Sequence, residues 1–480
     1  MTALDLASLM APPSTPLLLA SAEGAPEVPL SVTLIFSALL LAMILSLALE
    51  EKIHAKKSLI AGVFAVVCLL LGTAFDLMPF GPVEVGGHEI EMPVYIPAVD
   101  WGVIAIILGS SLFIDVTSKS GLFTWIAIKL TKASRGEPRR LLWFYGLMTV
   151  VFSAVLNNVT AMLIVGSLSG VSLKKLGREQ YLLGFLVIEG LLTNIGGLLT
   201  LISSVPNIIV GTAAGISFVE FFIKASPYVA VATVITVLMG IKLFKIDKLP
   251  DDAARAEAAR QVESFDENDG IESRHFFVFG AAMTVLFVIF IATTSILPWI
   301  SELGMGYVAL AFAAIMLIRY KSSVDQFYKG LDWDLLGFFA ALFVVINVME
   351  HAAVLELIGE GLAYLIGLGE TLGTGLVLVS AAAFSSVTDN IPLAAMLSKI
   401  LANMDTASTD PKWWSVVFGA NLGGNLTPIG SASTVVAVTL MHKYGLPMSF
   451  GRFVKSAFLF AFLQILLAVC YVLWLVPLLS

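Results

Sequence analysis

The chain has 480 residues, of which 58% are hydrophobic and 13% charged, and its mean hydropathy is +0.94. Soluble globular domains carry about 25% charged residues, so this composition excludes a cytosolic enzyme. The net charge of −8 excludes a nucleic-acid partner, and the two cysteines and five scattered histidines fit neither a disulfide framework nor a metal-ligand spacing. The composition predicts an all-α polytopic protein embedded in the lipid bilayer.

Residues 1–30 contain several prolines but neither lysine nor arginine, so we expect an extended extracytoplasmic tail there rather than a secretory signal. Ten apolar stretches follow, of lengths near the roughly 20 residues that a helix needs to cross the hydrocarbon core. They lie at about 31–49, 58–78, 101–117, 181–213, 226–246, 276–298, 305–318, 334–349, 413–441 and 456–479.

Two further apolar runs, at about 141–173 and 371–398, are each too long for one crossing and too short for two. Each would form arms of about 13–17 residues, or roughly 20–25 Å of helix. We therefore predict two re-entrant hairpins that enter and leave the membrane on one side. Short amphipathic helices near 118–129 and 353–365 are expected to lead into them.

The hydrophilic segment 247–274 contains nine acidic and four basic residues and is expected to be a cytoplasmic linker. With ten crossings and two hairpins, 24 of the 27 lysines and arginines fall on the inner side; Lys224, Lys399 and Lys412 are the exceptions. This charge bias predicts a multi-pass protein of the bacterial inner membrane with both termini extracytoplasmic.

The two halves of the chain are related by an internal repeat. FSAVLNNVTAM (152–162) aligns with FSSVTDNIPLA (384–394), and TNIGGLLTLISSVPN (193–207) aligns with ANLGGNLTPIGSAST (420–434). Residues 31–246 and 275–480 would each make five crossings plus one hairpin, and an odd number of crossings inverts the second repeat. Inverted-topology repeats are the architecture of secondary transporters.

Polar patches interrupt the apolar helices at matching places in both repeats, and such interruptions indicate a substrate or ion site. The candidate binding residues are Ser153, Asn157, Asn158, Thr160, Asn194, Gly196 and Gly197 in the first repeat, and Ser385, Thr388, Asp389, Asn390, Asn421, Gly423, Gly424 and Thr427 in the second. Their oxygen atoms suit a hard cation, and Na⁺ could be held by Asn157, Asn158, Asp389 and Asn390. The alternative is that these asparagines and serines join helices and that the Gly-Gly pairs allow close packing.

Ionisable groups at membrane depth are costly and usually functional, which singles out Asp389 and Glu189 as proton-relay candidates. A structural carboxylate is the alternative for Asp389. Asp115 lies close to the end of its span, where capping explains it equally well. Asp100, Asp332 and Asp334 open helices and are expected to cap them; these three have no assigned role in transport.

At these motifs the chain resembles the ion transporter superfamily, in the group of arsenite permeases, NhaD-type sodium/proton antiporters and the melanosomal P protein. The resemblance runs from about 100 to 480 and is densest in LNNVTAMLI, TNIGG, TDNIPLAAM and GANLGGNLTPIGSAS. SKSGLFTWIAIKL and SRGEPRR make the P-protein-like branch the nearest. The resemblance implies a scaffold domain (about 31–115 and 276–349), a transport domain, a homodimer and an elevator motion.

The family's ion-binding tips fall on Asn157 to Thr160 and on Thr388 to Asn390. Relatives usually have Asp-Asn at the first tip, where this chain has Asn157-Asn158, and often Gly-Asp-Pro-Pro-Asn in the first break, where it has SSVPN (203–207). Asp389 is therefore the one carboxylate in the matched tips.

We expect a secondary active transporter of a small ion coupled to Na⁺ or H⁺, with sodium/proton antiport favoured and no bound cofactor. Transport of arsenite-like oxyanions or of a carboxylate is the alternative. A channel is less consistent with paired broken helices. An intramembrane enzyme would need a catalytic histidine, paired acids or a metal site, which the sequence lacks.

Overall fold

The computed structural model describes residues 28–78, 82–85, 88–388 and 390–479. In this part of the chain eight helices are long and apolar enough to cross a membrane. The sheet structure described there is one antiparallel pair, β1 (Pro82–Val85) with β2 (His88–Glu91). The all-α polytopic membrane fold is thus confirmed, and most of the tail expected at 1–30 lies outside the described residues.

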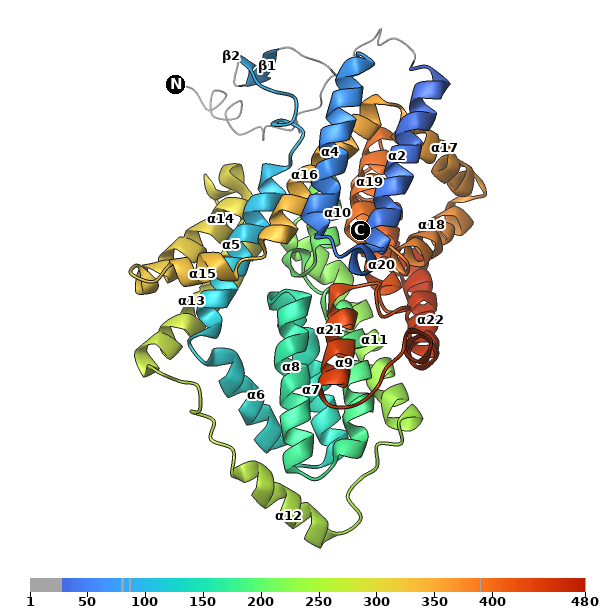
Figure 1. Cartoon of the computed structure of the whole chain (residues 1–480). Helices are drawn as coiled ribbons and strands as arrows, with labels where there is room; N and C mark the ends of the chain where they lie inside the picture. The colour runs from blue at the N-terminus through green and yellow to red at the C-terminus, as the bar shows by residue number, and fades with distance from the viewer. Residues whose placement is uncertain (1–27, 79–81, 86–87, 389, 480) are drawn as a thin grey trace, which may run out of the picture.

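The first half runs from three membrane helices through a hairpin and a broken helix to one long helix (Figure 1). Its elements are α2 (Leu30–Ala48), α3 (Glu50–Ile53), α4 (Lys57–Ala74), α5 (Trp101–Ser118), α6 (Leu122–Ala133), α7 (Pro138–Val155), α8 (Asn158–Lys175), η1 (Glu179–Tyr181), α9 (Leu182–Gly196), η2 (Leu201–Ser203), α10 (Val205–Ala213) and α11 (Phe218–Leu243).

The second half follows the linker and has the same order of long, short, paired and broken helices. Its elements are α12 (Asp252–Glu263), α13 (Arg274–Thr293), α14 (Ile300–Leu317), η3 (Ile318–Tyr320), α15 (Asp325–Gly330), α16 (Trp333–His351), α17 (Val354–Gly367), α18 (Glu370–Ser385), α19 (Asn390–Asn403), α20 (Pro411–Gly423), α21 (Ala432–Lys443), α22 (Phe450–Trp474) and η4 (Val476–Leu478).

The sequence repeat is also a repeat of packing. The chain from α5 to α11 has its counterpart from α16 to α22, with α6 and α17 as the short linking helices. α10 packs on α19 as α21 packs on α8, and α9 contacts α11 as α20 contacts α22. In Figure 1, α7 and α8 lie in the lower half of the molecule near α12, whereas α18 and α19 lie in the upper half near α2.

The two hairpins differ in length. α18 and α19 have 16 and 14 residues, within the expected range, whereas α7 and α8 have 18 each. The expectation of shorter arms was wrong for the first hairpin because its helices continue past the apolar run. Pro138 and two arginines open α7, and Lys174 and Lys175 close α8.

The two broken helices account for the remaining crossings. α9 ends at Gly196 and α10 resumes at Val205, while α20 ends at Gly423 and α21 resumes at Ala432. Together with the eight full-length helices, these two pairs provide one structural element for each of the ten predicted crossings.

Small residues set the contact between α5 and α14. A Cβ on Gly109 would lie 2.5 Å from the carbonyl carbon of Ala309, and one on Gly306 would lie 2.9 Å from Ala105 Cβ. Glycine at both contacts therefore lets the two backbones approach closely, as is usual where membrane helices associate. In the equivalent place of the other half, α4 packs on α16.

Helix starts follow the capping chemistry of their first residues. Asp100 accepts the backbone N–H of Val103, and Asp332 accepts that of Leu335, so both cap their helices as expected. Asp334 differs from the expectation. Its carboxylate accepts the backbone N–H and the hydroxyl of Ser58, and so joins α16 to the start of α4.

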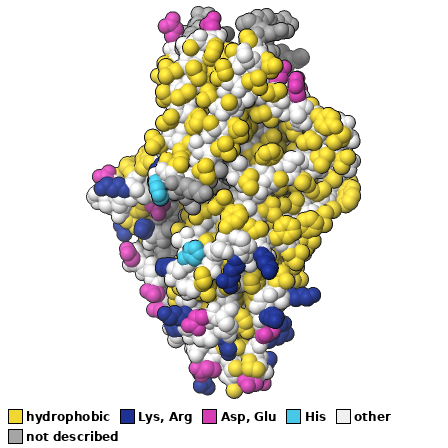
Figure 2. Space-filling view, turned by 45° about the vertical axis from the view of Figure 1, so that its right-hand side comes forward, with side chains coloured by type: hydrophobic (Ala, Val, Ile, Leu, Met, Phe, Trp, Pro, Cys, Tyr) yellow, Lys and Arg dark blue, Asp and Glu magenta, His cyan; other side chains and the backbone are white. Residues whose placement is uncertain are grey.

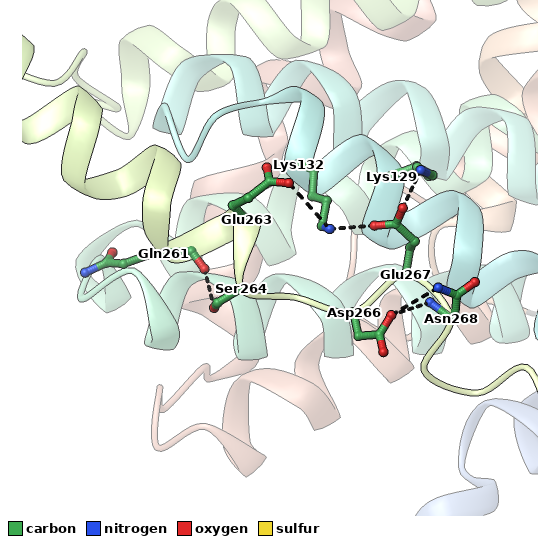
Figure 3. A network of polar contacts seen from close by, with 8 residues as sticks. All are labelled: Lys129, Lys132, Gln261, Glu263, Ser264, Asp266, Glu267 and Asn268. Carbon is green, nitrogen blue, oxygen red and sulfur yellow. Dashed lines mark hydrogen bonds and ion pairs between the residues drawn. The ribbon is translucent and has the colours of Figure 1, made fainter.

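The linker packs against the short helix α6. Glu267 lies 2.6 Å from Lys129 Nζ and 2.5 Å from Lys132 Nζ, and Figure 3 shows the carboxylate between the two lysines. Figure 2 shows charged side chains gathered at the lower end of the molecule and hydrophobic side chains over its upper part. α12 lies at this lower end in Figure 1, so the linker belongs to the charged end.

Candidate functional site

The first hairpin turns at Asn157, between α7 and α8. Asn157 is exposed, and its Oδ1 accepts the backbone N–H of Thr160 at 2.8 Å, which caps α8. The buried Ser153 Oγ lies 2.7 Å from Asn158 Oδ1 and 2.6 Å from the carbonyl oxygen of Thr193 on α9. The tip is therefore fixed to the broken helix by a hydroxyl one turn before it.

The first break lies directly against this tip. A Cβ on Gly196 would lie 2.6 Å from the carbonyl oxygen of Val150, and one on Gly197 would lie 2.9 Å from Asn158 Nδ2. A side chain at 196 would meet rigid backbone, whereas one at 197 would meet the amide end of the Asn158 side chain, so the Gly-Gly pair is a close contact between helix and hairpin. The carbonyl oxygen of Gly197 accepts Asn207 Nδ2 at 2.6 Å, so this backbone group is already paired.

The second hairpin turns between Ser385 and Asn390, the first residue of α19. Ser385 Oγ donates to the carbonyl oxygen of Ala420, and Thr388 Oγ1 donates to that of Phe384 at 2.8 Å. Asp389, the carboxylate singled out from the sequence, lies outside the described residues.

The second break repeats the close contact of the first. A Cβ on Gly423 would lie 2.3 Å from the carbonyl oxygen of Ala382, and one on Gly424 would lie 2.9 Å from Ser431 Cβ. Glycine at 423 therefore lets the broken helix approach the hairpin arm α18, and glycine at 424 lets the helix end approach its own loop.

Two hydrogen bonds between hairpin and break occur in both repeats. In each, a buried serine of the first hairpin arm donates to the broken helix, and a threonine of the break donates back to the hairpin. The pairs are Ser153 to Thr193 O and Thr200 to Ala154 O in the first repeat, and Ser385 to Ala420 O and Thr427 to Ser386 O in the second. The chain thus builds the same tip-and-break unit twice.

Asparagines of the breaks join the two repeats to each other. Asn194 Nδ2 lies 2.8 Å from Asn425 Oδ1 and 2.9 Å from Ser431 Oγ. In the matching contact, Ser204 Oγ donates to Asn421 Oδ1 at 2.7 Å. All five side chains are buried or partly buried. Asn194 and Asn421 act in this structure as interhelical hydrogen-bond partners, the alternative that the sequence left open.

The tips, in contrast, keep unpaired polar atoms. Asn158 Nδ2, Thr160 Oγ1 and the Asn390 side chain have no hydrogen-bond partner among the described residues. These groups are partly exposed, so they can reach a ligand. The polar side chains of the breaks therefore hold the two repeats together, whereas those of the tips keep donors and acceptors that a ligand can use.

Glu189 is a buried carboxylate on the first broken helix. It lies in the middle of α9, is 0% exposed, and accepts the hydroxyl of Ser169 on α8 through Oε1. Oε2 has no partner among the described residues. Asp115, by contrast, is exposed in the last turn of α5, in keeping with a role at the helix end.

Metal-ligand chemistry is limited to oxygen atoms here. The described residues contain no group of three or more His, Cys, Asp or Glu side chains that could hold a metal ion. A cation at the tips would therefore rely on amide, hydroxyl and backbone oxygens, together with any contribution from Asp389.

Sequence reasoning missed several polar partners that the fold brings together. Gln464 on α22 donates to Thr236 on α11 and accepts Asn425 Nδ2, each at 2.9 Å or less. Tyr145 on α7 lies between Thr131 and Ser172. A glutamine inside the apolar run 456–479 was a usable signal for the first set, whereas serines and threonines are too common in membrane helices to stand out.

Comparison with known proteins places the chain among transporters. Residues 56–419 match the family model described as citrate transporter, CitMHS. The chain is 31% identical to the "46 kDa membrane protein" of Mycobacterium leprae over 383 residues, which covers 78% of this chain and 86% of the relative. It is 26% identical to the human P protein over 511 residues, covering 89% of this chain and 60% of the P protein. The expected resemblance to the P protein is confirmed.

Solved transporter structures share the fold. The Alcanivorax borkumensis YdaH transporter matches with a TM-score of 0.58 at 14% identity over 88% of this chain and 98% of that one. Neisseria gonorrhoeae MtrF, described as one of a class of antimetabolite efflux pumps, matches with 0.57 at 12% identity over 88% and 95%. The matched family and these neighbours are transporters and not enzymes.

Proposed function

The chain belongs to the citrate transporter family, and we propose that it is a secondary active transporter of a small ion coupled to Na⁺ or H⁺. The observation that supports this most is the tip-and-break unit built twice from matched residues. A pair of such units around one centre gives a site that two related conformations can expose in turn.

The tips are the proposed ion-binding positions. In the first repeat, Asn158 and Thr160 present polar atoms without a partner among the described residues, and in the second repeat Asn390 does the same. Asp389 would supply the negative charge that a bound Na⁺ needs. Because amide, hydroxyl and carboxylate oxygens suit a hard cation, we favour sodium/proton exchange.

A carboxylate is the second candidate substrate, and two observations favour it. The matching family model is described as a citrate transporter. α8 and α19 also begin at the tips, where backbone N–H groups and the helix dipole attract an anion. Arsenite-like oxyanions belong to the same alternative because they would use the same donors.

The proposed cycle moves one body against another. The hairpins, broken helices, α11 and α22 would form the transport domain, and α4, α5, α14 and α16 the core of the scaffold. The proposal also includes an elevator motion between these bodies and a homodimer. It further includes inverted repeats, both termini outside and a location in the bacterial inner membrane.

Uptake into proteoliposomes tests the function and separates the two substrates. Purified protein is reconstituted, and entry of labelled Na⁺ and of labelled citrate is followed under an imposed pH gradient. Saturable Na⁺ flux driven by the gradient supports cation/proton exchange, and saturable citrate flux without Na⁺/H⁺ exchange supports the carboxylate alternative. Absence of saturable flux for Na⁺, citrate and arsenite would contradict the proposed function.

A further inference from the structure

Glu189 lies at one end of a set of buried hydroxyl groups. Its Oε1 accepts Ser169 Oγ at 2.5 Å, and its Oε2 is buried without a partner among the described residues. A carboxylate with one unpaired oxygen at this depth of a membrane protein is costly to keep charged, and such groups are usually functional.

Three more hydroxyls continue from Ser169 toward the linker end of the molecule. Ser172 is on the next turn of α8, and its Oγ lies 2.8 Å from the hydroxyl of Tyr145 on α7. The Tyr145 hydroxyl lies 2.7 Å from Thr131 Oγ1 on α6. All of these side chains are fully buried.

The row ends at the helix that the linker covers. Thr131 is followed directly by Lys132, whose ammonium group pairs with Glu267. α6 and α12 are in contact, and Figure 3 shows the ion pairs of Lys129 and Lys132 with Glu267. Thr131 is therefore the member of the row on the helix that contacts the linker.

The second repeat lacks this row. With the offsets of the repeat, Glu189 corresponds to Val416, Tyr145 to Val377 and Ser169 to Leu401, and all three of these counterparts are buried. The same corner of the fold thus packs well with apolar side chains. The fold does not require a carboxylate and a phenol at these places, so their presence in one repeat points to a function.

We propose that Glu189 exchanges its proton with the linker side of the membrane through the hydroxyls of Ser169, Ser172, Tyr145 and Thr131. The proposal rests on the proton coupling of the proposed function and assigns it a route on one side. A proton enters at Thr131, each hydroxyl accepts one proton and passes on its own, and the Glu189 carboxylate becomes a carboxylic acid. One hydronium ion is consumed, and the reverse order releases it.

One step of the route has no direct hydrogen bond. Ser169 and Ser172 are three residues apart on α8, about 4.5 Å along the helix axis, and they lie on neighbouring turns of the same side. Rotation of the two hydroxyls, or one water molecule between them, completes the row.

The other charged groups around Glu189 lie on the helices that pack against α9. Besides Glu189, Tyr145 is the titratable side chain of this row, and its helix α7 packs directly on α9. The charged residues of α7, α8, α11, α20, α21 and α22, which pack around α9, lie within two turns of a helix end. The middle turns of these six helices therefore carry no charged side chain among the described residues.

Infrared difference spectroscopy on the purified full-length protein in lipid tests the route without any transport substrate. The carboxylic-acid band that is present in the wild type and absent in Glu189→Gln reports the proton on Glu189. After a rapid pH change, Tyr145→Phe should slow the change of this band on the order of 100-fold, the lower range for a positioned proton-transfer group. The substitution keeps the ring, which packs edge-on to Phe185.

Thr149→Val is the matched control, because it removes a buried hydroxyl of α7 one turn from Tyr145 that bonds only to its own helix. A wild-type rate in Thr149→Val and a slow one in Tyr145→Phe supports the route. Equal rates in all three proteins, or a band that does not respond to pH, overturns it. A wild type that transports none of the tested ions contradicts the proposed function and leaves the infrared result to decide the route.

Discussion

At the scale of single residues, glycine decides how closely the hairpins approach the breaks. Gly196 and Gly423 occupy matched positions, and a Cβ at either would lie less than 3 Å from a backbone carbonyl oxygen. These distances explain why both repeats have glycine there. They agree with the alternative interpretation from the sequence, in which the Gly-Gly pairs allow close packing of helices. The neighbouring Gly197 and Gly424 meet side-chain atoms instead, so their roles differ.

We expect Gly423→Ala to destabilise the protein by about 1–3 kcal/mol, because the added methyl group overpacks against a rigid backbone. The thermal unfolding midpoint of the purified variant measures the effect. Gly62→Ala is the control, since its Cβ would meet no atom within 4 Å. That change should be neutral or stabilising by about 0.5–1 kcal/mol. Equal midpoints for the two variants would show that the contact at Gly423 is not tight.

Asn421 offers a second test at this scale. Replacing it by alanine leaves Ser204 Oγ and Asn207 Oδ1 buried without their partner, which costs about 1–3 kcal/mol for an unsatisfied group. Ser415→Ala, which removes one buried hydroxyl bonded to a carbonyl on α18, is the comparison. A larger loss of unfolding midpoint is expected for Asn421→Ala. A smaller one would mean that water replaces the asparagine.

At the scale of helices, the linker and α6 form an ionic contact between Glu267 and the two lysines Lys129 and Lys132. Lys129 and Lys132, through hydrogen bonds first, lower the pKa of the Glu267 carboxyl from 4.5 to about 2. The contribution of this contact to the stability of the protein is therefore fully present above pH 4.5 and is lost as the pH falls through about 2. The groups are near the surface, so salt should screen the contact.

Glu267→Gln should therefore raise hydrogen exchange in α12 and in the residues around Glu267, and it should remove most of the salt sensitivity of that exchange. Hydrogen–deuterium exchange at low and high salt measures both effects. Asp269→Asn is the control, because Asp269 forms no ion pair among the described residues. Unchanged exchange in Glu267→Gln would mean that packing alone holds the linker.

The sequence predicted these elements to different degrees. The lengths of the apolar runs predicted the membrane-spanning helices, and the Gly-Gly pairs predicted the helix breaks, because both are local features of the sequence. The lengths of α7 and α8 were underestimated because their charged ends lie outside the apolar run from which the lengths were predicted. The bond from Asp334 to Ser58 joins residues 276 positions apart, and no local pattern contains it.

At the scale of the whole molecule, the internal repeat predicted that hairpin tips and helix breaks lie together. It did not predict which of their polar side chains form hydrogen bonds. Matched motifs placed hairpin tips beside breaks, and the structure brings them into contact. Whether a polar group forms a hydrogen bond between helices depends on which side chains the fold brings next to it. Asn194 and Asn158 are equally conspicuous in sequence, yet only the amide nitrogen of Asn194 is paired.

The central claim, ion-coupled transport through the paired tips, is tested most directly by the internal pH of proteoliposomes when Na⁺ is added outside. The account predicts a Na⁺-driven pH change in the wild type that is lost in Asp389→Asn and retained in Asp405→Asn, an exposed aspartate beyond the end of α19. A full response in Asp389→Asn, or no response to Na⁺, citrate or arsenite in the wild type, would contradict it.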